Sequence, residues 1–446
     1  MSDTIPDPII FRERAVDLGD NPNRARIPPR SSKIRTGFHL QFYHDWKPVT
    51  LVNCYLHEFV RPYRLAYAAW GNTQKNYEAD CAQFTIFLAY RNKRWEDADW
   101  LDVLEFSALN QTGVSSRTRR RFSKATSRRR VLTVIAVLEW AYAKKLIARR
   151  VVPEGGYSEI GKEEALPPPP SKDAKVNRIP TMRFQLILEA LGPDLSDAAN
   201  WTPDQGTMSP RLAATVALAT GMRITETLSL TVMQLVNLES ELDPENPDKL
   251  IELKIVETKG KDERIVIFPS HIVRLIGDYV TYERSLITDS ALERGKRSSQ
   301  LSEKIFLNSL YSNHRDLGNA QSSDYLSRKF RQAVIKLGFL RDEKRFELDE
   351  FDQPLIVDGS PVVYIVKVNA YTFHDLRHTF TASVAELLSE GGEGDVWKTL
   401  QTLLGHEHSD TTRTIYGRHV EVNGSRLTEA ISRWFGSIDK TFGGEI

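Results

Sequence analysis

The chain has little cysteine. Only Cys54 and Cys81 occur among its 446 residues, so a disulfide framework is not expected and a reducing, intracellular compartment is favoured. The cysteines and histidines do not cluster with the spacing of a zinc finger. No apolar run is long enough to cross a bilayer, and the N-terminus lacks the apolar core of a signal peptide. We therefore expect a cytoplasmic protein with no membrane partner.

The chain also lacks an excess of charge of either sign. Its formal net charge is +1, which by itself indicates no polyanionic partner. The basic residues are nevertheless concentrated between 115 and 150, where twelve lysines and arginines occur with a single acid, Glu139. Such clustering is typical of a face that binds a polyanion, although a solvated basic helix surface has the same composition. We assign the candidate face to Arg117, Arg119, Arg120, Arg121, Lys124, Arg128, Arg129 and Arg130.

The distribution of apolar residues and prolines predicts an arm, two domains and a linker. Residues 1–64 are rich in Pro, Arg and Asp without a sustained period, so we expect a partly disordered arm. Within residues 65–155, apolar side chains recur at three- and four-residue spacing, as amphipathic helices require. The run Pro167–Pro170 indicates a semi-rigid linker over 156–178. The second domain then covers 179–446.

The second domain is predicted to be mainly helical with small β-hairpins. Alternating apolar residues across 250–269, on both sides of a G-K-D turn, predict one hairpin. Another strand-like pair, around Asp358–Gly359, marks 341–367 as an insertion of unknown purpose. Helices are expected at 181–191, 211–219, 324–337, 374–388 and 396–404.

Side chains suited to phosphoryl transfer gather between His374 and Tyr416. The segment reads H-D-L-R-H-T-F from His374, L-G-H ending at His406 and R-T-I-Y ending at Tyr416. Guanidinium and imidazole groups donate to non-bridging phosphate oxygens, where charge grows in the transition state. A tyrosine oxygen can attack phosphorus and hold the cut end covalently. With T-G-M-R-I-T-E at 220–226, these groups suffice to break and rejoin a phosphodiester without a metal.

This pattern resembles the tyrosine recombinase (phage integrase) family. The likeness is strong over 210–416, moderate over 72–153 and absent from the first seventy residues. It implies a fold that is mainly α with small β-hairpins (α+β). In that fold a helical, SAM-like core-binding domain precedes the catalytic domain, and the two form a C-shaped clamp on DNA. The resemblance also implies a catalytic set that needs no cofactor: Arg223, Lys259, His374, Arg377, His406 and Tyr416.

The resemblance further implies a role for each member of this set. Arg223 and Arg377 grip the scissile phosphate, and His406 donates a hydrogen bond to it. His374 assists proton movement at Tyr416, which is the nucleophile. His374 and Arg377 are one helical turn apart, so they share a face of their helix.

The 250–269 hairpin and the first motif supply the remaining groups. A lysine at the tip of the hairpin protonates the 5′ leaving oxygen, a task that suits a flexible ammonium group. Lys259 fits the family's T-K-G pattern, and Lys261 is a competing candidate two residues away. Glu226, one turn after Arg223, fits the family's supporting acid.

Three observations bear on alternative functions. His378 lies four residues after His374, as in a two-ligand zinc site, but no Glu follows His374 and no third ligand is obvious, so we predict no metal. His406 and Tyr416 are ten residues apart, one more than in most members, which leaves open a catalytically silent DNA-binding relative. Type IB topoisomerases typically have lysine where this chain has His374, and that argues against a topoisomerase.

The leading hypothesis is a site-specific recombinase or integrase. It would bind double-stranded DNA at specific recombination sites and cut and rejoin it through a 3′-phosphotyrosine, for the integration, excision or transposition of a mobile element. Residues 426–442 have an apolar face, which would link four subunits into a homotetramer or else pack on its own domain. We expect the protein to be associated with the nucleoid.

Overall fold

The computed structural model describes most of both predicted domains. The described residues are 10–14, 39–43, 45–59, 67–153, 177–246, 249–255, 264–350, 353–390 and 433–434. They form two compact units: the first contains Met1–Ser171 and Lys344–Ile365, and the second contains Lys172–Glu343 and Val366–Ile446. The tip of the predicted insertion thus belongs to the first unit although it lies between motifs of the second.

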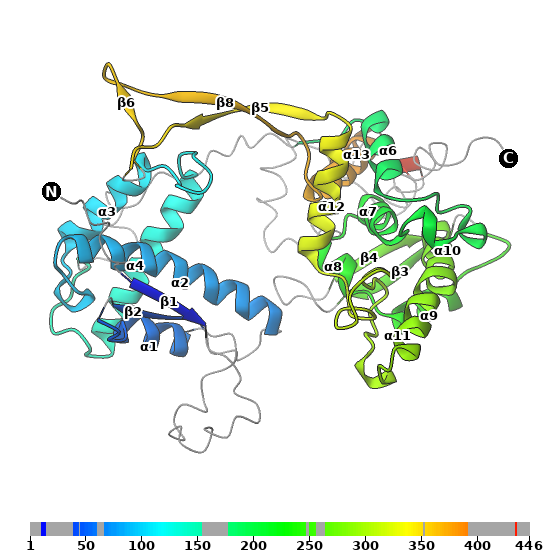
Figure 1. Cartoon of the computed structure of the whole chain (residues 1–446), viewed down its shortest axis with the longest axis horizontal. Coiled ribbons are helices and arrows are strands. Elements are labelled where there is room, and N and C mark those ends of the chain that lie inside the picture. The colour runs from blue at the N-terminus through cyan, green and yellow to red at the C-terminus, as the bar shows by residue number, and fades with distance from the viewer. Residues whose placement is uncertain are drawn as a thin grey trace. The chain divides into compact units, whose positions relative to one another are not determined.

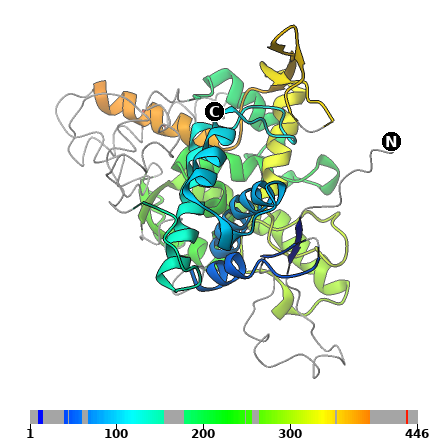
Figure 2. The same ribbon diagram turned by 90° about the vertical axis from the view of Figure 1, so that its left-hand side faces the viewer.

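The part of the first unit before residue 171 is a helical bundle with a short β-pair (Figure 1), and Figure 2 views its helices from another side. At its centre Phe84 lies edge-on to Trp95 and Phe106, with ring centroids 4.8 and 5.0 Å apart. Such edge-to-face pairs stabilise a core beyond the apolar area that they bury. The elements are β1 (Ile10–Arg14), β2 (His39–Tyr43), α1 (Thr50–Phe59), α2 (Tyr67–Tyr90), η3 (Trp95–Asp97), α3 (Trp100–Thr112) and α4 (Lys124–Ala143).

Part of the expected N-terminal arm is built into this unit. Strands β1 and β2 pair antiparallel, and Val52, Tyr55 and Leu56 of α1 are buried in the unit's core. The amide of Gln41, also buried, donates to the Glu78 carbonyl of α2 at 2.7 Å. The helical unit therefore includes residues well before 65, because α1 needs the apolar face of α2 and α4 to cover its own.

The second unit, shown mainly in green to orange in Figure 1, contains the predicted second domain apart from residues 344–365. Its predicted helix at 181–191 and its hairpin at 250–269 are confirmed, the latter as an antiparallel pair. Its helices are α6 (Thr181–Leu191), α7 (Ser209–Thr220), α8 (Ile224–Ser229), α9 (Val232–Ser240), α10 (Ser270–Tyr279), the π-helix η7 (Val280–Arg284), α11 (Ser285–Glu293), α12 (Ser323–Lys336) and α13 (His374–Glu390), with short 3-10 turns η5 (Ala198–Asn200), η6 (Pro203–Gln205) and η8 (Ser298–Gln300).

Among the described residues of the chain's later half, the strands form three pairs, of which β3–β4 and β6–β7 are antiparallel. Between β6 and β7, Asp358 and Gly359 both have positive φ, 51° and 75°. Two consecutive left-handed residues are the signature of a type I′ hairpin turn, which the sequence Asp-Gly favours. The pairs are β3 (Leu250–Ile255) with β4 (Arg264–Pro269), β5 (Leu340–Phe346) with β8 (Val363–Asn369), and β6 (Ile356–Val357) with β7 (Ser360–Pro361).

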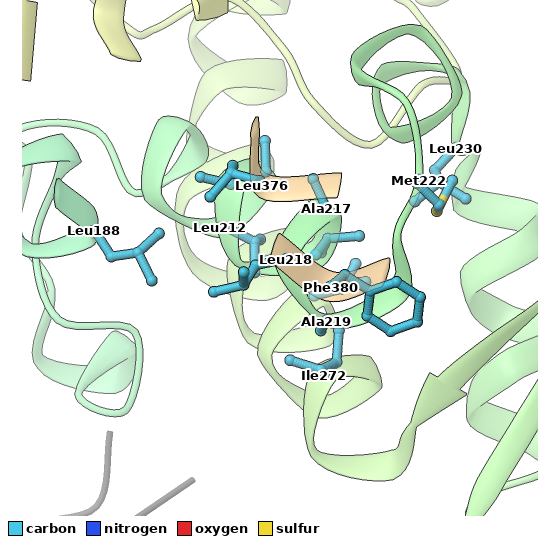
Figure 3. Close-up of a cluster of buried hydrophobic side chains, with 14 of the residues drawn as sticks. Leu188, Leu212, Ala217, Leu218, Ala219, Met222, Leu230, Ile272, Leu376 and Phe380 are labelled. Carbon is cyan, nitrogen blue, oxygen red and sulfur yellow. The ribbon is translucent and has the colours of Figure 1, made fainter. Parts of the chain in front are cut away.

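Helix α7 is the centre of the second unit's core. Every residue of α7 is buried, and its alanines allow neighbouring helices to approach closely. Figure 3 shows Leu376 and Phe380 of α13 lying beside Ala217 and Leu218 of α7. Helix α13, which begins at His374, is thereby held against the helix that ends just before Arg223.

Over the described residues the fold is mainly α with small β-hairpins, so the predicted fold class is confirmed. In the part of the chain that the structure describes, no helix combines the length and apolar character needed to span a bilayer.

Candidate active site

A left-handed turn at Gly221 brings Arg223 to the start of α8. Gly221 has φ 66° and ends α7, and a Cβ at this position would lie 2.5 Å from a ring carbon of Phe380. Only glycine meets both conditions without strain. Arg223 is then the N-cap residue of α8, with its side chain 21% exposed. The turn therefore presents a guanidinium that solvent, or a ligand, can reach.

The buried carboxylate of Glu226 accepts hydrogen bonds from both the backbone and the side chain of Arg223. The Arg223 backbone N–H donates to Glu226 Oε2 at 2.8 Å, and its Nη1 donates to Oε1 at 2.7 Å. The Glu226 side chain is 1% exposed. A buried carboxylate is stable only when it is paired and hydrogen-bonded, so the geometry of Arg223 and the burial of Glu226 depend on each other.

A second guanidinium, that of Arg377 on α13, lies at the same carboxylate. Arg377 Nη1 donates to the Gly221 carbonyl at 2.6 Å and is 4.0 Å from Glu226 Oε2. Its side chain is 3% exposed. Two cations therefore share one anion, which leaves a local charge of about +1 where α8 meets α13.

His374 completes the described part of the site. Desolvation, together with the neighbouring His378, Arg377 and Arg223, lowers the pKa of His374 to about 4, against the opposite effect of Asp375. Its ring centroid is 4.7 Å from that of His378, with the ring planes at 86°. Desolvation also lowers the pKa of His378. Both imidazoles are consequently neutral near pH 7, the form in which an imidazole can accept a proton.

Hydrogen bonds hold the start of α13, where His374 lies, against the segment that precedes α6. Asp375 accepts from the backbone N–H of Thr372 at 2.7 Å and from the amide of Asn177 at 3.2 Å. Two residues after Asn177, the backbone N–H of Ile179 donates to Thr379 Oγ1 at 2.9 Å. The end of the predicted linker thus runs along α13 and anchors its first turns.

The structure places Arg223 and Arg377 at Glu226, the supporting acid of the first motif, and His374 close to both arginines, so three of the six predicted catalytic residues lie together. The other three, Lys259, His406 and Tyr416, lie outside the described residues. Among the described residues, no three His, Cys, Asp or Glu side chains are arranged to hold a metal ion. The rings of His374 and His378 pack perpendicular to each other.

Two of the predicted DNA-binding arginines hold the helical unit together. Arg129 makes a bidentate pair with Asp80 of α2, at 2.8 and 2.9 Å. Arg130 donates to Asn110 Oδ1 at 2.9 Å, and its guanidinium lies 4.1 Å from the centre of the Phe122 ring. Both residues therefore fix α4 against its neighbours, a role that sequence spacing alone does not reveal.

The other predicted cations lie in or next to the loop between α3 and α4. Arg119 and Arg121 contact the insertion. The side chains of Arg117, Arg120 and Lys124 are exposed, and Arg128 is half-buried.

A second basic surface, absent from the sequence prediction, lies on α12. The helix buries Leu326 and Phe330, and its opposite face exposes four cations without an intervening acid. A cluster of exposed cations usually indicates a polyanionic partner. The signal was present in the amphipathic pattern S-R-K-F-R-Q-A-V-I-K, and the exposed cations are Arg328, Lys329, Arg331 and Lys336.

Three comparisons with known proteins were made. No protein-family model matches the chain, and no curated protein matches its sequence. Among solved structures, the chain is similar to the XerH site-specific recombinase bound to palindromic difH substrate in a post-cleavage complex, with 17% identity, 81% of this chain and 80% of that chain covered, and a TM-score of 0.43.

Two further solved structures are also similar to the chain. A lambda integrase (75–356) dimer bound to a COC′ core site has 15% identity, covers 84% of this chain and 98% of its own, and gives a TM-score of 0.43. The XerA recombinase has 20% identity, coverages of 86% and 97%, and a TM-score of 0.29. Each TM-score is below 0.5, so we base the functional proposal on the residues of the site itself.

Proposed function

We propose that this chain is a site-specific tyrosine recombinase that cuts and rejoins DNA through a 3′-phosphotyrosine at Tyr416. The observation that carries the proposal is the convergence of Arg223 and Arg377 on buried Glu226, beside a neutral His374. This arrangement suits a phosphodiester, whose transition state gathers negative charge on its non-bridging oxygens.

The two arginines have different parts in binding the phosphate. Arg223 is partly exposed, so its guanidinium fork can donate to a non-bridging oxygen while Glu226 keeps it in place. Arg377 is buried and held by the Gly221 carbonyl. Arg377 therefore supplies a fixed positive charge close to the phosphate at little cost in conformational entropy when DNA binds.

His374 acts on the proton of the nucleophile. Because its pKa is lowered to about 4, its imidazole is neutral and can accept the Tyr416 proton as the new oxygen–phosphorus bond forms. The bond from phosphorus to the 5′ oxygen breaks in the same displacement, and Lys259 gives that oxygen a proton. One phosphodiester replaces another, so the step needs no nucleotide and no redox partner. His406 donates to the phosphate.

The basic surfaces of the two units support DNA as the substrate. The cations Arg117, Arg120 and Lys124 of the first unit and the exposed face of α12 in the second suit contacts to the phosphate backbone. We propose further that the enzyme acts as a homotetramer, joined through residues 426–442, in the integration or excision of a mobile element.

Trapping of a covalent adduct tests the activity. The full chain is incubated with a random-sequence library of nicked duplexes, in which a released fragment diffuses away and prevents religation. Protein-bound DNA is then recovered under denaturing conditions. We expect sequence-enriched adducts with the natural chain and none with Tyr416→Phe. Adducts that persist in Tyr416→Phe would exclude Tyr416 as the nucleophile.

A DNA-binding relative that does not cut is the second candidate. It is favoured by one observation, the ten-residue spacing from His406 to Tyr416, which is one residue longer than in most members of the family. Sequence-selective DNA binding without any adduct from the natural chain would support it. The same result would contradict the recombinase proposal.

A further inference from the structure

The tip of the insertion carries charge opposite to that of the loop it contacts. From Phe346 to Val366 the insertion has no lysine, arginine or histidine but five carboxylates, those of Glu347, Asp349, Glu350, Asp352 and Asp358. Within the first unit it meets the loop between α3 and α4, whose cations are Arg117, Arg119, Arg120 and Arg121. We call residues 346–365 the acidic hairpin and residues 113–123 the arginine loop.

Contacts of several kinds join the acidic hairpin to the arginine loop, and the Tyr364 hydroxyl also interacts with the Arg119 side chain. The backbone N–H of Phe346 donates to the Arg119 carbonyl at 2.8 Å. Arg119 Nη1 donates to Glu347 Oε1 at 3.2 Å. The Arg121 guanidinium lies 5.5 Å from the centre of the Phe346 ring, within cation–π range. Two guanidiniums of the candidate DNA-binding face are thus occupied within the chain itself.

The arginine loop has a defined shape around these contacts. Arg119 has φ 53°, in the left-handed region, and its N–H donates to the Ser115 carbonyl at 2.7 Å. The Ser115 N–H donates to the Arg120 carbonyl at 2.8 Å, and the Phe122 N–H donates to Gly113 at 3.1 Å. The loop therefore holds Arg119 in one orientation, toward Glu347.

The contact is also weak enough to be exchanged. The side chains of Arg119 and Glu347 are 41% and 43% exposed, and ion pairs at such sites contribute little to stability in water. A DNA phosphate offers the same guanidinium a stronger partner and releases counterions when it binds. The carboxylates of the hairpin would repel a duplex that approaches the loop. The hairpin and a duplex therefore cannot bind the Arg119 guanidinium at the same time.

We propose that the acidic hairpin is an internal competitor for DNA, which holds Arg119 and Arg121 until a duplex displaces it. The inference rests on the proposed function in one respect, that the arginine loop contacts DNA. Competition of this kind lowers affinity for any duplex by a similar factor. It therefore discourages non-specific binding, which depends almost wholly on phosphate contacts.

Salt-dependent binding by the full-length chain tests the competition. Glu347→Gln removes the carboxylate that pairs with Arg119, while the Tyr364 hydroxyl stays beside the Arg119 side chain. Glu350→Gln removes the same charge from the same hairpin as a matched control. With a short random-sequence duplex at about 0.1 M salt, we expect Glu347→Gln to bind about two- to five-fold more tightly, and Glu350→Gln to bind almost as the natural chain does. Only Glu347→Gln should steepen the slope of log K against log salt, by about 0.9, the value for one added phosphate contact.

A double variant makes this result specific. Arg119→Asn removes the cation and keeps a residue that tolerates the left-handed backbone, so it should cancel the gain made by Glu347→Gln. Equal affinities and equal salt slopes for Glu347→Gln and Glu350→Gln would overturn the proposal, as would a gain that survives Arg119→Asn.

A measurement without DNA separates failure of this inference from failure of the proposed function. The rate at which phenylglyoxal modifies Arg119, followed by peptide mass spectrometry, should rise in Glu347→Gln and not in Glu350→Gln. A chain that binds no duplex would contradict the proposed function, and the Arg119 rate would still decide whether the hairpin covers the loop. Equal rates in all three proteins would overturn the inference.

Discussion

Glu226 determines how the two arginines of the candidate site lie. It accepts from Arg223 at 2.8 and 2.7 Å and lies 4.0 Å from Arg377. A carboxylate buried to this degree is costly without partners, and a buried guanidinium is costly without an anion. The three groups therefore stabilise one another in a single arrangement, and their sum of about +1 is what a phosphate diester encounters.

At the same scale, the titration of His374 tests the protonation state that the proposed chemistry requires. Its pKa is lowered to about 4 by desolvation and by nearby cationic groups. NMR titration of the His374 ring protons in the DNA-free protein should therefore show a midpoint well below 6.5, the ordinary value for histidine. Binding of a phosphate-containing duplex should move that midpoint upward, because a nearby anion favours imidazolium.

The sign of the accompanying stability change follows from linkage. The folded protein holds His374 neutral while the unfolded chain binds a proton below about 6.5, so this contribution is present above pH 6.5 and is lost as pH falls toward 4. His374→Asn should flatten the fall in unfolding free energy over that interval. A midpoint at or above 6.5 would contradict the neutral state.

At the scale of elements, the join between α7 and α8 places the site. Gly221 ends α7 in the left-handed conformation, lies against Phe380 and offers its carbonyl to Arg377. One residue therefore connects the helix that carries Arg377 with the turn that carries Arg223. Displacement of this turn would move both guanidiniums at once.

Substitution of Gly221 by alanine tests this join. The new Cβ would meet the Phe380 ring at 2.5 Å, in addition to the cost of a left-handed alanine. We expect a loss of about 2–4 kcal/mol in unfolding free energy and strongly reduced adduct formation. Gly295→Ala is the control, because Gly295 has φ 89° with nothing within 4 Å of its added Cβ, so it should lose about 1 kcal/mol. Equal losses in urea unfolding would contradict the packing argument.

The π-helix η7 supplies a buried acid to the start of α7. Glu283 accepts from the backbone N–H of Met208 at 2.6 Å and from the hydroxyl of Thr207. Desolvation nevertheless raises its pKa to about 7, against the lowering effect of both hydrogen bonds. The extra residue of a π-turn changes the direction of the side chains around it. In this chain the π-turn contains Glu283, whose side chain points toward the start of α7.

Glu283 gives a pH dependence opposite in sign to that of His374. Its folded pKa is raised, so the stability it contributes is fully present below about 4.5 and is lost as pH rises through 7, by on the order of 3 kcal/mol. Glu283→Gln should remove this loss when the free energy of unfolding in urea is compared at pH 5, roughly two units below the midpoint, and at pH 8, roughly one unit above it. Exposed Glu293→Gln is the control. Unchanged pH dependence in Glu283→Gln would contradict a raised pKa.

At the scale of the whole molecule, local patterns predicted the elements and long-range contacts decided the rest. The helix at 181–191 and the hairpin at 250–269 follow from apolar spacing and turn residues that lie within the segments themselves. The burial of α1 could not be predicted in this way, because its partners are on α2 and α4. Part of the helical unit therefore lies within residues 1–64, where the sequence predicted an arm.

The same distinction applies to the candidate site. The motifs identified Arg223 and Arg377, but the contact of Arg377 with Gly221 joins residues 156 positions apart. The pairing of Arg119 with Glu347 spans 228 positions, and the role of Arg129 at Asp80 also depends on tertiary packing. Charge clustering indicates where cations gather, whereas only the fold shows which of them already have partners.

The most direct test of the central claim is the chemical identity of the residue joined to DNA. Adducts from the natural chain are digested with nuclease and protease, and the peptide that carries a nucleotide is sequenced by mass spectrometry. The account predicts a single modified peptide with a 3′-phosphonucleotide on the oxygen of Tyr416. A nucleotide on any other residue, or sequence-selective DNA binding with no modified peptide, would contradict it.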